Sequence, residues 1–195
     1  MRALFRIGII LALLALTAAG AYLYRNYLQK KRLMQAQEKR FNLFEAEVRA
    51  AALRHGVDKE LIKAVIWRES NFDPDAKGLA GERGLMQIMP AAADDFVKFA
   101  KVENFQYDDL FKPEVNVDAG TWYLGRALKR WEGRDNPLPF ALAEYNAGRK
   151  HALRWAAGDT NMTAAEFITN IDFPTTRSYV TNIINKYQSL RNETK

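Results

Sequence analysis

The first strong pattern along the chain is a run of 18 uncharged, mostly apolar residues at positions 7–24. As a helix this run is just long enough to cross a bilayer, and it ends among tyrosines placed like an interfacial belt: Tyr22, Tyr24 and Tyr27. A cleaved signal peptide is the alternative, because residues 19–21 (Ala-Gly-Ala) form a small-x-small cleavage site. The apolar run continues past that site, which favours an uncleaved anchor over residues 1–24. Either leader would export the rest of the chain.

Polar residues fill positions 25–40, which are rich in Gln, Lys and Arg and contain neither Gly nor Pro. That composition predicts a helical stalk that continues from the leader. From residue 41 onward, apolar residues recur three and four positions apart, as on a helix with one buried face: Phe41, Phe44, Val48, Ala51 and Ala52. We therefore predict a leader at 1–24, a basic stalk at 25–40 and one globular domain at 41–195.

Helical spacing recurs through the rest of the domain, and capping residues mark where helices begin and end. Gly56 would end the first helix, and Asp58 would cap the second. Further helices are expected from Pro90, over 113–131, over 140–146 with Gly148 at the end, and after a cap at Thr175 or Thr176. Residues 71–84 form a glycine-punctuated loop. Because no stretch alternates with the period of a strand, the domain is predicted to be all-α.

Charge and composition narrow the function. Residues 1–40 contain eight Lys and Arg against one Glu, a net charge of +7, whereas residues 41–195 contain 21 against 22, a net charge of −1. The basic residues therefore belong beside a membrane, and the domain lacks the positive surface of a nucleic-acid binder. The chain has no cysteine and two histidines. His55 is at a predicted helix end, a common surface or capping position, and His151 is in a basic run. Disulfides, a histidine triad and a histidine-rich metal site are disfavoured.

Glu69 is the candidate for chemistry because it lies near the end of the predicted helix 61–70, on a largely apolar face. Its neighbours three and four positions away are apolar except for one carboxylate: Val65, Ile66, Phe72 and Asp73. Burial and a nearby carboxylate both raise the pKa of a carboxyl, as a general acid near neutral pH requires. Helix phase alone equally allows Glu69 to face solvent. The glycine-rich loop that returns at residues 84–90 favours a site, because glycines let backbone approach a ligand.

Three ordered motifs make the sequence resemble a known family. They are VIWRESNFDP at 65–74, GLMQIMP at 84–90 and AEYNAG at 143–148. Together they resemble the soluble lytic transglycosylase (SLT) catalytic domain, which is similar to goose-type lysozyme, and the resemblance covers roughly residues 41–190. It implies an all-α, lysozyme-like domain that acts on the glycan strands of peptidoglycan.

The resemblance also implies roles for individual residues. The catalytic acid and base would be Glu69, and the substrate contacts would be Ser70, Met86, Gln87, Tyr145, Asn146 and Tyr179. Tyr179 belongs to the segment FPTTRSYV at 173–180, which resembles the family's closing motif and would lie near Glu69. Core packing is the alternative for Met86 and Tyr145, and helix capping for Ser70 and Asn146. Departures from the family pattern leave the substrate range open: Gly78, Ala92, Thr169, Asp172 and Thr175.

The implied reaction uses a single carboxylate. Glu69 would protonate the glycosidic oxygen after N-acetylmuramic acid, the acetamido group of that sugar would attack its anomeric carbon, and Glu69 would then deprotonate the 6-hydroxyl to close a 1,6-anhydro ring. No cofactor and no metal are implied. The alternatives are a muramidase of the same fold that uses water, and a non-catalytic wall-binding assembly scaffold.

The resemblance and the leader together imply partners and a location. The partners would be peptidoglycan glycan strands, the membrane through the N-terminal helix, and cell-wall or secretion machinery if the enzyme serves one apparatus. The domain would lie outside the cytoplasmic membrane, tethered by residues 1–24, or free in the periplasm if the leader is cleaved.

Overall fold

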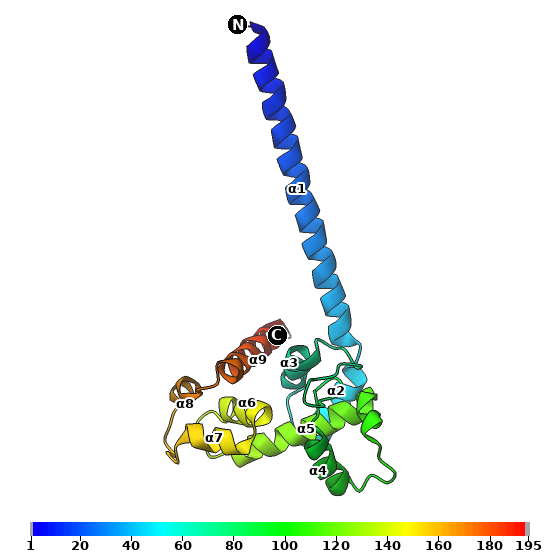
Figure 1. The fold of residues 1–195 in the computed structure, drawn as a ribbon, viewed down its shortest axis with the longest axis vertical. Coiled ribbons are helices and arrows are strands. Elements are labelled where there is room, and N and C mark those ends of the chain that lie inside the picture. Colours follow the sequence, from blue (N-terminus) through cyan, green and yellow to red (C-terminus); the bar gives the residue numbers. More distant parts are fainter. Residues whose placement is uncertain (1, 194–195) are drawn as a thin grey trace. The chain divides into compact units, whose positions relative to one another are not determined.

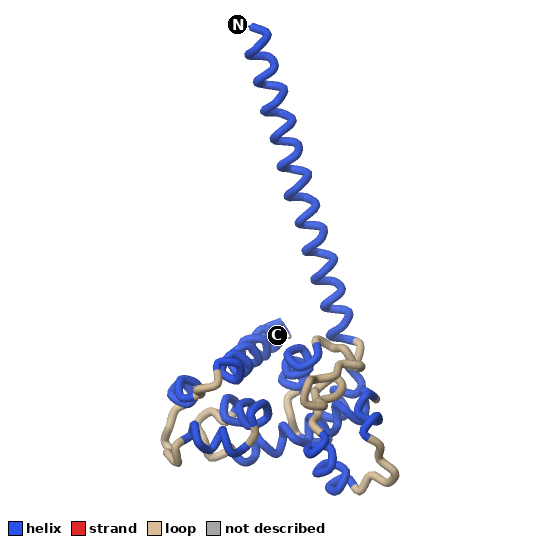
Figure 2. The backbone as a smooth tube through the Cα atoms, in the orientation of Figure 1, coloured by secondary structure: helices blue, strands red, loops and turns tan. Residues whose placement is uncertain are grey.

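The computed structural model describes the backbone of residues 2–193, and their side chains except at positions 2–5, 7, 9–12, 37 and 38. Contacts divide the chain into two compact units, Met1–Leu43 and Phe44–Lys195. Throughout the described backbone every regular element is a helix (Figure 2). Outside the helices, Arg83 pairs with Lys77 and Ile88 in isolated bridges. The all-α prediction is confirmed.

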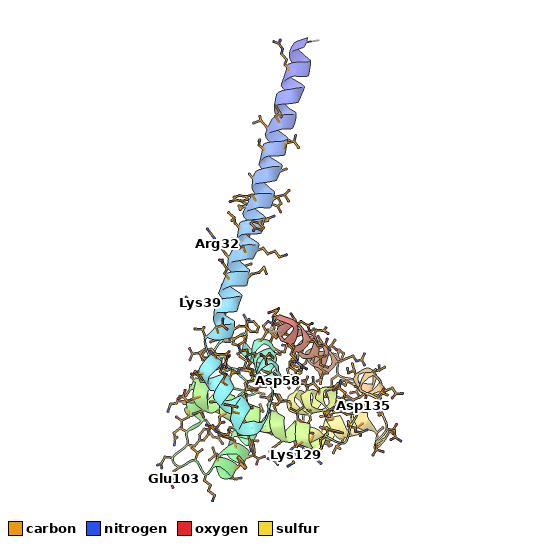
Figure 3. The ribbon with its side chains drawn as sticks, turned by 180° about the vertical axis from the view of Figure 1, so that it is seen from behind. Arg32, Lys39, Asp58, Glu103, Lys129 and Asp135 are labelled. Carbon is orange, nitrogen blue, oxygen red and sulfur yellow. The ribbon has the colours of Figure 1, made fainter. Side chains whose placement is uncertain are left out.

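The first unit is formed by one helix, α1 (Arg2–Asn42). Charged side chains of the predicted stalk are exposed, among them Arg32 and Lys39 (Figure 3). Across the residues that the structure describes, no helix is both long and apolar enough to cross a membrane. The anchor expected at 1–24 falls partly on positions outside the described residues and side chains.

Phe41 and Phe44 do not share one helix, contrary to the prediction from apolar spacing. α1 ends at Asn42, and α2 (Glu45–His55) begins after a turn. The Phe44 backbone (φ −119°, ψ 30°) leaves the helical conformation, and its carbonyl oxygen accepts a hydrogen bond from the Val48 N–H at 3.0 Å. Apolar spacing does not reveal this break because neither glycine nor proline marks it.

Capping residues fix the ends of α2 and α3 (Lys59–Ser70) as predicted. Gly56 ends α2 in the left-handed conformation (φ 65°). The Asp58 side chain caps α3 by accepting a hydrogen bond from the Glu60 backbone N–H at 2.9 Å. Asn71 then ends α3, also in the left-handed conformation (φ 51°), so the chain leaves the helix directly after Ser70.

Two helices form the centre of the second unit, α5 (Pro113–Arg130) and α6 (Leu138–Ala147) (Figure 1). α5 packs against α2, α6, α4 (Pro90–Ala100) and the 3-10 helix η1 (Tyr107–Phe111). α6 also packs against α7 (Arg149–Ala156), α8 (Ala164–Asn170) and α9 (Pro174–Glu193). α9 lies against α3 as well, which brings α9 beside the first motif at 65–74.

A buried carboxylate ties α5 to α6. Glu144, in the third motif, accepts a hydrogen bond from Trp131 Nε1 at 2.7 Å and forms an ion pair with Arg130. Its side chain is 1% exposed. A buried charge that lost these partners would be strongly destabilising, so Glu144 serves the core and is not free for chemistry.

The last helix begins earlier than predicted. α9 starts at Pro174, ahead of both Thr175 and Thr176, because the fixed φ of proline suits the first turn and no N–H is needed there. Thr176 is buried inside that turn, and its hydroxyl donates a hydrogen bond to Asn146 Oδ1 at 2.8 Å. The residue expected as a cap therefore connects α9 to the end of α6.

Both histidines pack against the protein. The surface or capping position expected for His55 is wrong, because its ring is 9% exposed and its Nε2 lies 2.7 Å from Asp118 Oδ1 on α5. His151 lies beside the aromatic rings of Trp155 and Phe173, with centroids 5.8 Å and 4.8 Å away. Each histidine is thus part of the packing.

Candidate active site

Glu69 lies in the last turn of α3, the helix against which α9 packs. The hydroxyl of Tyr179, on α9, donates a hydrogen bond to Glu69 Oε1 at 2.6 Å. Tyr179 is 2% exposed, so protein excludes water from that side of the carboxyl. The packing of α3 on α9 thereby joins the first motif to the closing motif.

Burial raises the pKa of the Glu69 carboxyl from 4.5 to about 7. The hydrogen bond from Tyr179 and the charge of Arg68 lower this pKa, whereas the carboxylate of Glu82 raises it. The Arg68 guanidinium lies over the Tyr179 ring, 5.5 Å from its centroid, and does not pair with Glu69. A substantial fraction of Glu69 therefore carries a proton at neutral pH.

The like charge near Glu69 is Glu82, and the prediction of Asp73 in that role is wrong. α3 ends at Asn71, so counting three or four positions from Glu69 no longer gives a shared face. Asp73 is exposed, and its Oδ1 accepts a hydrogen bond from the Asp75 backbone N–H at 3.0 Å. Glu82 reaches the site because the loop between α3 and α4 folds back.

Glu69 opens onto a pocket of about 530 Å³. Its polar and aromatic lining consists of Arg68, Glu69, Glu82, Gln87, Tyr123, Tyr145 and Asn146. The remainder is apolar side chain or glycine backbone: Gly78, Ile88, Met89, Ala91, Ala92, Ala147 and Gly148. A pocket of this size with a few converging polar groups is typical of a ligand site. In the described part of the chain, no three His, Asp or Glu side chains gather as metal ligands.

The loop that carries the second motif is held from inside by Asn116 of α5, which the sequence did not single out. Its buried side chain accepts the Met86 N–H at 2.7 Å and donates to the carbonyl oxygens of Arg83 at 2.7 Å and Leu110 at 2.8 Å. Gly84 (φ 72°) lies so close to Leu110 and Asn116 that a Cβ would not fit. The backbone of the motif is therefore fixed by the protein itself.

Three of the predicted substrate contacts line the pocket: Gln87, Tyr145 and Asn146. Gln87 Nε2 donates to the carbonyl oxygens of Gly84 at 2.9 Å and Ala76 at 3.1 Å, which pins the side chain to its loop. No hydrogen bond from the described residues reaches its carbonyl Oε1. Gln87 therefore presents an acceptor, in a fixed position, to a ligand.

Tyr145 and Asn146 line the pocket from α6. The Tyr145 hydroxyl donates to the Met86 carbonyl oxygen at 2.9 Å, and its ring packs edge-to-face on Tyr123, with centroids 5.7 Å apart. Burial and the nearby Glu69 carboxyl raise the pKa of Tyr145 well above its usual value, so it remains a neutral donor. Tyr123 is a lining residue that the motifs did not indicate.

The other three predicted contacts lie behind the wall. Met86 is fully buried against Gly120 and Thr121, so its placement in the groove is wrong; an apolar side chain here is stabilised by the core. The Ser70 hydroxyl donates to the Leu85 carbonyl oxygen at 2.8 Å, which ties the end of α3 to the second motif. Tyr179 is buried and reaches the Glu69 carboxyl.

Comparison with known proteins agrees with this geometry. The family model of the transglycosylase SLT domain matches residues 47–168. Membrane-bound lytic murein transglycosylase F of Desulfosudis oleivorans is 36% identical over 129 residues, which are 65% of this chain and 26% of that protein. Soluble lytic murein transglycosylase of Salmonella typhimurium is 32% identical over 130 residues, which are 66% of this chain and 20% of that protein. The chain thus spans about a quarter or less of the length of these relatives.

The fold has a solved counterpart. The 70 kDa soluble lytic transglycosylase of Escherichia coli superposes with a TM-score of 0.72 at 28% sequence identity. The superposition covers 84% of this chain and 26% of that one. The family match, the three motifs and this shared fold agree, and the chain belongs to the transglycosylase SLT domain family.

Proposed function

We propose that this domain is a lytic transglycosylase that cleaves the β-1,4 bond between N-acetylmuramic acid (MurNAc) and N-acetylglucosamine in peptidoglycan, leaving 1,6-anhydroMurNAc ends. The observation that carries the proposal is Glu69, a carboxyl with a pKa of about 7 that Tyr179 holds at the edge of the pocket. Family membership supports the substrate class, because the relatives are named as lytic murein transglycosylases.

The first step is acid catalysis. Protonated Glu69 gives its proton to the glycosidic oxygen, and the bond from that oxygen to C1 of MurNAc breaks. The acetamido carbonyl oxygen of the same sugar forms a new bond to C1 as the leaving group departs. The hydrogen bond from Tyr179 occupies Oε1 and leaves Oε2 for the substrate.

The second step uses the same residue as a base. Glu69, now ionised, takes the proton of the 6-hydroxyl, whose oxygen attacks C1 and displaces the acetamido oxygen. The ring closes, Glu69 is protonated again, and no water is consumed. Because the 6-hydroxyl is already attached to the sugar, its effective concentration at C1 is very high.

The proposed roles of the other residues follow their positions. Gln87, Tyr145 and Asn146 contact the glycan, since they line the pocket with Glu69. Tyr179 orients Glu69. Ser70 and Met86 shape the wall from behind and do not touch substrate.

A muramidase that uses water is the second candidate, and Glu82 is the observation that favours it. Inverting glycosidases use a second carboxylate to activate water, and Glu82 lines the same pocket as Glu69. Motif reasoning gave only one carboxylate and did not foresee this group. The transglycosylase remains preferred because of the tethered 6-hydroxyl and the names of the relatives.

We further propose that residues 1–24 deliver the domain to the outer face of the cytoplasmic membrane, with 25–40 as a stalk. Support comes from the uncharged run at 7–24 and from the flanking basic residues, together with a relative named as membrane-bound. Fractionation of cells should find the full chain with the membrane or in the periplasm. Recovery in the cytoplasm would contradict this placement.

Digestion of purified peptidoglycan, followed by mass spectrometry of the fragments, tests the activity. The wild-type protein should release anhydro fragments, each lighter by one water than a hydrolysis product. Glu69→Gln keeps the shape of the side chain but cannot transfer a proton, so release should fall at least about 10²-fold. Asp73→Asn, an exposed carboxylate of the same motif, is the matched control. Near-normal lysis by Glu69→Gln would contradict the role of Glu69 as the catalytic acid and base. It would favour the alternative of a non-catalytic scaffold.

A further inference from the structure

Glu82 is a pocket residue outside the three motifs, and the loop is built around it. Its Oε2 accepts a hydrogen bond from the Ala80 backbone N–H at 2.9 Å. Its side chain occupies the space beside Gly78 where a Cβ would otherwise stand, and its carbonyl oxygen accepts the Gly78 N–H at 2.8 Å. These contacts hold the carboxylate in one place on the pocket wall.

The neighbouring cations are engaged elsewhere. Arg83 Nη1 donates to Asp108 Oδ1 at 2.8 Å, and its guanidinium lies 5.6 Å from the centre of the Phe111 ring. Arg68 lies over the Tyr179 ring. No ion pair to Glu82 forms among the described side chains, so no cation in direct contact neutralises its charge.

Few charges face Glu69. The titratable and charged groups around its pocket are Arg68 on α3, Glu82 in the loop, Tyr123 on α5, Tyr145 on α6 and Tyr179 on α9. α4 contributes only Ala91 and Ala92 to the lining. Three of these groups are phenols, and Arg68 is the one cation. Glu82 is therefore the one group in this set whose charge opposes ionisation of Glu69.

We propose that Glu82 is a positioning residue that acts through Glu69: its fixed charge adds to the effect of burial and favours the protonated form of Glu69 between catalytic cycles. The same repulsion returns in the second step, because an ionised Glu69 beside Glu82 takes the proton of the 6-hydroxyl more readily. The proton that leaves Glu69 for the glycosidic oxygen is thus replaced from the sugar. The catalytic part of this inference rests on the proposed function, whereas the effect on Glu69 does not.

Glu82→Gln removes the charge and keeps an oxygen that can accept the Ala80 N–H. Glu82→Asp keeps the charge on a shorter side chain. Glu103→Gln is the matched control, because Glu103 is exposed in the segment after α4 (Figure 3). All three substitutions would be made in the full chain.

The first measurement is a carbon-13 NMR titration of the Glu69 carboxyl, which needs no activity. We expect the midpoint to fall by about half a pH unit or more in Glu82→Gln, and to stay in place in Glu103→Gln. Glu82→Asp should restore much of the shift. An unchanged Glu69 midpoint in Glu82→Gln overturns the inference.

The second measurement is the pH profile of glycan cleavage. A midpoint lower by half a unit reduces the protonated fraction about threefold at pH 8 and hardly at all at pH 5.5. Activity of Glu82→Gln should therefore fall about threefold at pH 8 only. A uniform loss at both pH values would assign Glu82 to substrate contact or structure and overturn the inference. A shifted NMR midpoint in a protein without lytic activity would instead support the inference and refute the proposed function.

Discussion

The hydroxyl of Tyr145 donates a hydrogen bond to the main-chain oxygen of Met86, 2.9 Å away, which joins the third motif directly to the second. Tyr145 lines the pocket on α6, whereas the Met86 side chain is buried in the core. The groove wall and the core thus meet at one peptide group. The position of Gln87, the next residue, depends on that link.

Tyr145→Phe should test this link. Loss of one hydrogen bond should lower the free energy of unfolding by about 1 kcal/mol. The neighbouring Gln87 should also become less well placed, so KM for glycan strands should rise more than kcat falls. Urea unfolding and steady-state kinetics measure the two effects. Unchanged KM would show that the link does not position the motif.

Asn116→Ala should be among the most destabilising substitutions in the domain. It removes three hydrogen bonds and leaves the Met86 N–H and the Leu110 carbonyl oxygen without a partner, whereas the Arg83 carbonyl oxygen keeps its hydrogen bond from the Ile88 N–H. Each unpaired group costs about 1–3 kcal/mol, so the loss should exceed about 2 kcal/mol. Asn182→Ala on the exposed face of α9 is the control and should cost less than about 0.5 kcal/mol in urea unfolding.

Glu69→Gln should stabilise the protein, in a pH-dependent way. Burial raises the pKa of Glu69 from 4.5 to about 7, so the folded state binds this proton more tightly than the unfolded state. Its contribution to stability is fully present below pH 4.5 and is lost as pH rises through 7. Glutamine carries no charge and shows no such loss.

The variant should therefore match wild type near pH 4.5 and exceed it at pH 8, by at most about 3 kcal/mol. Chemical denaturation at the two pH values measures the difference. Equal stability of the two proteins at pH 8 would show that the Glu69 carboxyl is not held in apolar surroundings.

Tyr179→Phe should raise the pKa of the Glu69 carboxyl. The hydrogen bond from Tyr179 lowers the pKa of Glu69, so its removal raises that pKa above about 7. The basic limb of the pH–rate profile should shift to higher pH, the rate should fall because Glu69 is less well oriented, and the products should stay the same. A downward shift of the limb would contradict the assigned hydrogen bond.

The sequence predicted the helices whose ends carry strong local signals. Asp58 before α3, Gly56 after α2 and Pro90 at the start of α4 each act through the backbone of their own turn, so neighbouring residues suffice to predict them. The predicted start of α9 is wrong because two helix-start signals compete there, Pro174 and the threonines after it.

Two short helices, α7 and α8, were not predicted. A signal existed for α8, since Thr163 and Glu166 form a capping box in which each side chain bonds the backbone of the other. α7 has only eight residues, so its helical state depends on packing against α6 and α8. Such helices are marginal without tertiary contacts.

At the site, the sequence predicts the residues that its motifs mark. It does not predict contacts that depend on how the loop between α3 and α4 folds. Burial of Glu69 follows from its place beside Val65 and Ile66 on α3 and from its contact with α9, whereas helix phase alone equally allowed a side chain that faces solvent. The sequence predicts Asp73 as the carboxylate near Glu69, but Glu82 has that position, because Asn71 ends the helix in the left-handed conformation. Asn116 was missed because its partners are backbone groups of a distant loop, which no sequence pattern marks.

Digestion of purified glycan strands in water enriched in oxygen-18 shows whether the 6-hydroxyl or water attacks the sugar. If Glu69 closes the ring on the sugar's own 6-hydroxyl, no solvent oxygen enters the product. We expect unlabelled fragments that end in 1,6-anhydroMurNAc. Reducing ends that carry oxygen-18, without anhydro fragments, would mean that water is the nucleophile and that the enzyme is a muramidase.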